Sequence, residues 1–64
     1  MLFYVRKHKV NDALVEEPNE LWVPDSIRES KVGEYILVND NYPAAYVVAD
    51  NEKAARQWAI QNLR

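Results

Sequence analysis

The sequence predicts a small α+β domain, in which an antiparallel sheet of four or five strands carries one C-terminal helix on one face. Two observations support this prediction. Residues 1–49 contain short runs of β-branched and aromatic residues, separated by turn-forming Asn, Asp and Pro. Residues 51–63 instead place apolar residues at helical spacing. Because the chain has only 64 residues, we expect residues 1–64 to form a single compact domain.

The first predicted element is a β-hairpin over residues 2–17. Residues 2–10 are rich in aromatic and β-branched types and contain no helix breaker. Asn11 and Asp12 follow, and both residue types tolerate the backbone conformations of a two-residue turn. Residues 13–17 then form the returning strand.

The middle of the chain is predicted to be irregular. Pro18 and Asn19 favour a turn over residues 17–20, and residues 21–23 then form a short strand that Pro24 ends. Residues 26–29 have the spacing of a capping box, which indicates a single helical turn. The only glycine, Gly33, suits a left-handed helix ending or a tight bend.

Residues 34–38 and 44–49 predict a second hairpin, connected by the turn-forming residues 39–43. Both arms are almost continuously apolar, so we expect both to lie centrally in the sheet. Residues 51–63 then predict a helix, capped by Asp50 or Asn51 and supported by a Glu52–Arg56 pair four residues apart. Its apolar half contains Ala54, Ala55, Trp58, Ala59 and Leu63.

The composition argues against most catalytic chemistry. The chain has no cysteine, one histidine (His8) and one glycine, which excludes disulfides, thiolate sites and glycine-rich phosphate loops. Its serines, Ser26 and Ser30, lie in no nucleophile motif. Glu16 and Glu17 are adjacent and would face opposite sides of a strand, so they do not form a catalytic pair. We therefore expect no enzyme activity, no cofactor and no metal site.

No segment of the sequence resembles a signal peptide or a membrane span. The N-terminal apolar run, residues 2–5, is short and is followed by basic residues, whereas a secretory signal begins with them. We expect a cytoplasmic protein, in the host cytoplasm if the chain is viral, with no membrane partner.

Charge is unevenly distributed, and this distribution suggests a binding surface. Residues 1–10 are basic, whereas residues 11–30 are strongly acidic and contain Trp22. An aromatic side chain flanked by carboxylates can dock onto a basic partner surface. The candidate protein-binding residues are Glu16, Glu17, Glu20, Trp22, Asp25 and Glu29, with Tyr42 as a second anchor at a loop tip.

Each of these residues also has a simpler interpretation. Because a small domain needs all the apolar burial available to it, the favoured expectation for Trp22 itself is a place in the core. The acidic residues could serve only for solubility, and Tyr42 could fold back over its hairpin.

A nucleic-acid interface is the first alternative. The N-terminal strand interleaves aromatic and basic residues, as sheet-based nucleic-acid binders do, with Tyr4, Arg6, Lys7 and Lys9 as candidates. The acidic pI of about 5.2 and the lack of the full aromatic–glycine pattern of RNA-recognition motifs argue against it. The basic residues could instead protect a strand edge from aggregation.

These observations predict a small non-enzymatic protein that binds a macromolecule, most simply another protein, and modulates or inhibits it. By size and composition alone, it is analogous to phage-encoded regulators of host enzymes. A nucleic-acid-binding regulator and a structural homo-oligomer subunit are the alternative interpretations.

Overall fold

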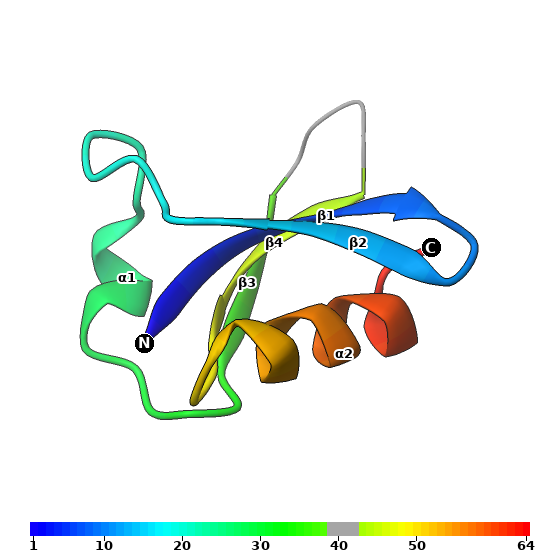
Figure 1. Ribbon diagram of the computed structural model, residues 1–64. Coiled ribbons are helices and arrows are strands. Elements are labelled where there is room, and N and C mark those ends of the chain that lie inside the picture. The colour runs from blue at the N-terminus through cyan, green and yellow to red at the C-terminus, as the bar shows by residue number, and fades with distance from the viewer. Residues whose placement is uncertain (39–42) are drawn as a thin grey trace.

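The computed structural model describes residues 1–38 and 43–64 and has the α+β architecture that the sequence predicts. Four antiparallel strands form one sheet in the order β2-β1-β4-β3. The C-terminal helix α2 packs across one face of this sheet (Figure 1). The elements in chain order are β1 (Leu2–Lys9), β2 (Asp12–Glu16), α1 (Asp25–Arg28), β3 (Tyr35–Val38), β4 (Ala44–Val48) and α2 (Glu52–Asn62).

The first predicted hairpin forms, with its turn shifted by one residue. The turn lies at Val10 and Asn11, because Asp12 already belongs to β2 and pairs with Lys9. A register irregularity between Lys7 and Lys9 accommodates this shift.

The second hairpin also forms, but its two arms differ in position. All five residues of β4 are buried between β1 and β3, as predicted for a central strand. β3 instead lies at the edge of the sheet, with Tyr35 and Leu37 exposed, so the expectation that both arms are central is wrong for β3. After β4 the chain continues into α2, and no strand of the described residues pairs with the outer edge of β3.

The pairing of β1 with β4 joins the two hairpins into one sheet. Phe3 lies opposite Val47, and Tyr4 lies opposite Tyr46. At the end of this ladder, the Ala49 N–H donates to the Met1 carbonyl at 2.8 Å. The two strands are far apart in the sequence, and local sequence patterns do not reveal this partnership.

The core beneath α2 is built from large residues on the sheet and small residues on the helix. Phe3, Val5 and Val47 point toward α2 from β1 and β4. The helix presents Ala55 and Ala59, both fully buried, and Leu63 follows at its C-terminal cap. Because alanine side chains are short, the helix can lie close to the strands and exclude water without a bulky interface. Trp58 and Ala54 pack at the margin of this core.

The start of α2 is capped as the sequence predicts. The Asn51 side chain accepts a hydrogen bond from the Ala54 N–H at 2.8 Å, so Asn51 rather than Asp50 is the cap. Glu52 and Arg56 form the predicted ion pair at 3.5 Å.

Residues 21–23 do not form the predicted strand. The Trp22 N–H donates to the Asn19 carbonyl at 2.9 Å, which closes a turn where the strand was expected. The predicted helical turn exists as α1, but it begins at Asp25 after Pro24, without a side-chain cap, so the capping box is wrong. Gly33 adopts a φ of 98° and bends the chain into β3, in agreement with its predicted role.

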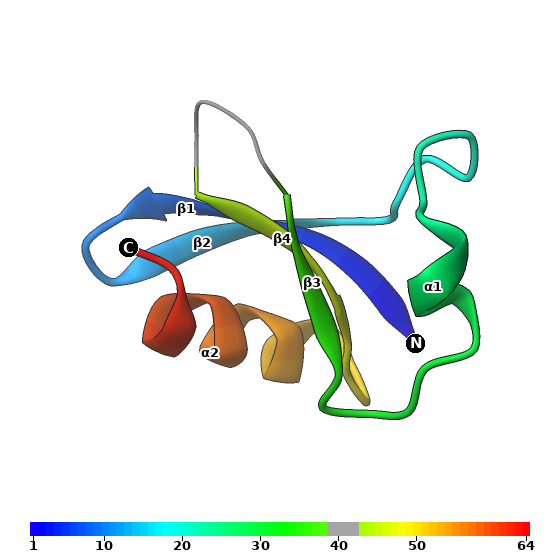
Figure 2. The same ribbon diagram turned by 180° about the vertical axis from the view of Figure 1, so that it is seen from behind.

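The two helices lie on different faces of the sheet. From the α1 segment, Val23 and Ile27 pack against Tyr46 and Val48, on the face opposite α2. Figure 2 shows α1 at one end of the sheet, well separated from α2. Part of this second face is therefore left without a helix. No helix in the described parts of the chain is long and apolar enough to span a membrane.

Arg56 connects α2 to the first hairpin. Its Nη1 donates to Asp12 Oδ1 at 3.1 Å and to the Ala13 carbonyl at 2.6 Å. The Ala13 N–H also donates to Asp12 Oδ1, at 2.8 Å. The hydrogen bond from Ala13, with a further contribution from Arg56, lowers the pKa of Asp12.

We predict that Asp12 makes the stability of the domain sensitive to acid. Because folding lowers its pKa, ionised Asp12 stabilises the folded state above the unfolded-state pKa of about 3.9, and this contribution is lost as the pH falls through the folded-state pKa. Asp12→Asn should therefore reduce the free energy of unfolding in urea at neutral pH, and the difference from wild type should shrink at acidic pH. Glu29→Gln, at an exposed residue, is the control. An Asp12→Asn effect that persists unchanged in acid would contradict this role.

Candidate functional site

The part of the second sheet face that α1 leaves uncovered contains a groove of about 530 Å³. Its floor is formed by β1, β4 and the end of β3, and its wall by the end of β2 and the segment that follows it. The lining residues are Tyr4, Glu16, Glu17, Asn19, Trp22, Val38 and Tyr46. The groove therefore combines aromatic side chains with two carboxylates.

Two tyrosines form the floor of the groove. Tyr4 and Tyr46 lie opposite each other across the β1–β4 ladder, and their ring centroids are 5.3 Å apart in a tilted arrangement. Tyr46 is 8% exposed, and its hydroxyl donates to the Trp22 carbonyl at 3.4 Å. This hydrogen bond connects the wall of the groove to its floor.

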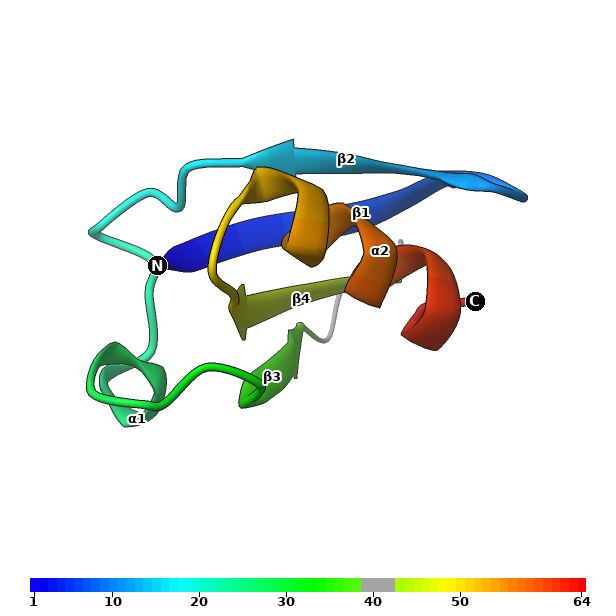
Figure 3. The same cartoon turned by 60° about the horizontal axis from the view of Figure 1, so that its bottom comes forward.

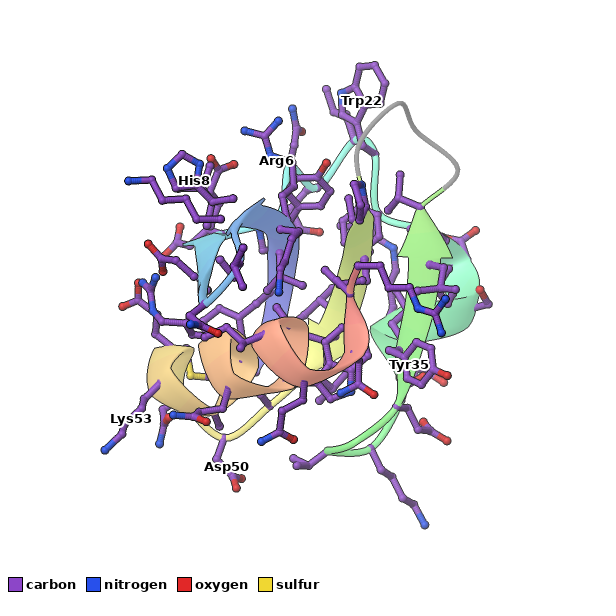
Figure 4. All side chains as sticks on the ribbon, turned by 90° about the vertical axis from the view of Figure 1, so that its right-hand side faces the viewer. Arg6, His8, Trp22, Tyr35, Asp50 and Lys53 are labelled. Carbon is purple, nitrogen blue, oxygen red and sulfur yellow. The ribbon has the colours of Figure 1, made fainter. Side chains whose placement is uncertain are left out.

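Trp22 is the exposed aromatic of the wall. The residue is 73% exposed, so the favoured expectation that Trp22 belongs to the core is wrong. The neighbouring Val23, together with Ile27, supplies the buried contacts on this face instead. Figure 4 shows Trp22 projecting from the end of the molecule opposite α2.

The acidic segment divides into two groups. Glu16 and Glu17 line the groove, whereas Glu20 and Asp25 pair with Arg28 at 2.7 and 3.2 Å. The hydrogen bond from Arg28 to Glu20 raises the pKa of the arginine, and the same guanidinium donates to the Glu20 carbonyl at 2.6 Å. Arg28 therefore partly neutralises one half of the predicted acidic surface. Among the described residues no ion pair involves Glu16 or Glu17, and these two carboxylates line the groove together with Trp22.

The structure does not bring all the predicted residues together. Glu29 is exposed at the end of α1 and does not line the groove. Tyr42 lies outside the described residues. Asn19, Val38 and Tyr46 line the groove although the sequence did not single them out. The alternation of side chains along β4 assigns Tyr46 to one face of the sheet. Only the register of β1 against β4 places Tyr46 beside Tyr4.

The candidate nucleic-acid residues are distributed over both faces of the sheet. Tyr4 and Arg6 belong to the face of the groove, where Arg6 lies opposite Leu14 of β2. Lys7 alternates to the other face, and its Nζ donates to the Ile60 carbonyl of α2 at 3.3 Å and to the Val10 carbonyl at 3.0 Å. Lys9 lies beyond the register irregularity, at the end of β1. A single basic stripe on β1 is therefore not formed.

The groove places aromatic rings beside two carboxylates. Carboxylates beside aromatic faces attract a cation that carries an apolar stem, because the rings contact the stem and also attract the charge. Among the residues that the structure describes, no group of three or more His, Asp or Glu side chains could hold a metal ion. Comparisons with protein families, with curated proteins and with solved structures find no match.

The exposure of Trp22 leads to a test that uses both tryptophans. Trp22→Ala should change the free energy of unfolding by about 0.5 kcal/mol or less, as is typical of exposed positions. Trp58→Ala should cost more than about 2 kcal/mol, because Trp58 packs on the core beneath α2. Urea denaturation followed by circular dichroism measures both values. In each single-tryptophan variant, acrylamide should quench Trp22 more strongly than Trp58, and equal destabilisation by the two substitutions would refute the assignment.

Proposed function

We propose that this chain is a small protein-interaction module that binds a partner protein through the groove and thereby modulates or inhibits the partner. The observation that carries the proposal is the placement of an exposed tryptophan beside two carboxylates over a tyrosine floor. Each of these features also occurs on surfaces with no function. Their convergence on the part of the sheet face that α1 leaves open supports binding.

The aromatic side chains would supply most of the contact energy. Tryptophan and tyrosine are over-represented among the residues that dominate interface energies, because they bury a large area at low entropic cost. The hydrogen bond from Tyr46 to the Trp22 carbonyl holds the wall near the floor before a partner arrives. A groove with such support loses less conformational freedom on binding.

The carboxylates indicate the kind of partner. Among the described residues that line the groove none is basic, and Glu16 and Glu17 give its rim a negative charge. A lysine or arginine next to an apolar side chain, on an exposed segment of the partner, matches this lining in charge and shape. Rim carboxylates of this kind mainly raise the association rate, whereas the buried aromatic contacts slow dissociation.

We predict that substitutions in the groove weaken binding of a captured partner without unfolding the chain. Trp22→Ala should weaken the affinity about 30-fold or more, which corresponds to at least about 2 kcal/mol. The double substitution Glu16→Lys and Glu17→Lys should slow association, and the affinity of the wild type should fall as salt is added. Proteins captured from a nuclease-treated lysate, with affinities then measured on the purified partner, provide the test.

The matched control is Glu29→Lys together with Asp50→Lys. It reverses the same number of charges at exposed residues but leaves the lining of the groove and the Arg28 ion pairs intact. A partner that the control retains and the groove variants lose supports the proposal. Equal capture by all variants would place binding elsewhere, and capture that disappears only after nuclease treatment would favour the nucleic-acid alternative. Circular dichroism spectra of all variants confirm that each one is folded.

A further inference from the structure

We propose that β3 is a self-association edge, at which a second copy of this chain adds its own β3 in antiparallel orientation about a two-fold axis. This inference is independent of the groove and of the proposed function. It starts from a difference between the two edge strands of the sheet, β2 and β3. An edge strand presents unpaired backbone donors and acceptors, and proteins usually protect such an edge with charges, prolines or covering groups.

The β2 edge is protected near the start of the strand. Along β2, every second residue directs its N–H and C=O groups to β1. The residues between them direct these groups to the open edge. Ala13 is one of the outward residues: its N–H donates to Asp12 Oδ1 and its carbonyl accepts from Arg56 at 2.6 Å. Charged residues also occupy both ends of this strand, at Asp12 and Glu16. A further strand could not pair here without displacing Arg56.

Within the part of the chain that the structure describes, the β3 edge has neither kind of protection. The strand reads Tyr-Ile-Leu-Val, with no charged residue and no proline. Figure 3 shows β3 as the outermost strand, beside β4, with α2 lying over the other part of the sheet. The one acidic residue that precedes it, Glu34, is turned back to accept a hydrogen bond from the Lys31 N–H at 2.8 Å.

The hydrogen bonds of β4 determine which residues of β3 face outward. The Val48 N–H donates to the Glu34 carbonyl at 3.0 Å, so the carbonyl of Glu34 points toward β4. Backbone direction alternates along an antiparallel strand, so Ile36 and Val38 also face β4. Tyr35 and Leu37 therefore direct their N–H and C=O groups to the open edge.

These two residues are complementary to a second copy of themselves. With Ile36 on the two-fold axis, Tyr35 of each copy faces Leu37 of the other, and their outward backbone groups can form four hydrogen bonds. The side chains of the two residues are 51% and 62% exposed, and each would cover its counterpart across the new ladder. Tyr35 is already packed against Trp58, with ring centroids 4.9 Å apart, so it is held in place for this contact.

The charges at the ends of the strand are compatible with this register. Glu34 of one copy would face the apolar Val38 of the other, so no two like charges meet across the axis. A strand of four residues forms a small interface, so we expect a reversible dimer that is populated at high protein concentration.

Because the chain contains no native cysteine, a single introduced cysteine can test the proposed register. In the proposed register, the two Ile36 residues form a non-hydrogen-bonded pair with Cα atoms about 4.5 Å apart, which is within the range of a disulfide. Ile36→Cys should therefore convert to a covalent dimer under mild oxidation. Leu37→Cys is the control, because its side chain is more exposed but faces Tyr35 of the other copy. If cross-links formed by random collision, the more exposed Leu37→Cys variant would form the covalent dimer faster than Ile36→Cys.

Sedimentation equilibrium of the wild type gives the second measurement. The apparent mass should rise from the 7.5 kDa monomer toward twice that value with concentration. Leu37→Lys should abolish this rise, whereas Leu14→Lys, the same change on the other edge strand, should leave it intact. A wild type that stays monomeric up to about 1 mM overturns the proposal. At that concentration, only a dimer with a free energy of association weaker than about 4 kcal/mol would escape detection. Equal oxidation of the two cysteine variants, or a dimer that survives Leu37→Lys, overturns it as well.

Discussion

The antiparallel pairing of β1 with β4 is the interaction on which the rest of the structure depends. Each hairpin alone is a two-stranded ribbon, which is marginally stable in water. When β1 and β4 pair, Phe3 and Val47 meet on one face and Tyr4 and Tyr46 on the other. The first pair belongs to the core that α2 covers, and the second forms the floor of the groove. A shift of one residue in this register would exchange the two faces and destroy both features.

The distribution of burial explains how so small a chain can expose a tryptophan. On one face, the alanines of α2 allow a close and well-packed core without a large side chain on the helix. On the other face, Val23 and Ile27 cover only the part of the sheet near Tyr46 and Val48. Trp22 then remains outside, held by a turn and by the hydrogen bond from Tyr46 to its carbonyl. The acidic residues divide in a similar way. Arg28 pairs with Glu20 and Asp25, whereas Glu16 and Glu17 line the groove.

The parts of the fold that sequence patterns predicted correctly are those with local causes. Both hairpins, α2, its polar cap at residue 50 or 51 and the bend at Gly33 follow from residue types that act on their own neighbourhood. The predicted strand at residues 21–23 failed because Asn19 closes a turn there, and the predicted capping box failed because α1 starts directly after Pro24. In the candidate site, Glu16, Glu17 and Trp22 were accessible to sequence analysis. Asn19, Val38 and Tyr46 were not, because they join the groove only through strand register and loop placement.

The sequence by itself determined that this is a cysteine-free α+β domain with basic ends, an acidic middle and an amphipathic C-terminal helix. Composition and short-range periodicity contain that information, since both depend on residues close together in the chain. The tertiary structure alone decided that Trp22 faces solvent, that the acidic segment is divided by Arg28, and that β3 rather than β2 is the open edge. These outcomes depend on which strands become neighbours and on which side chains fill the limited space between them. That competition is settled by packing over the whole domain, and no single segment of the chain specifies it.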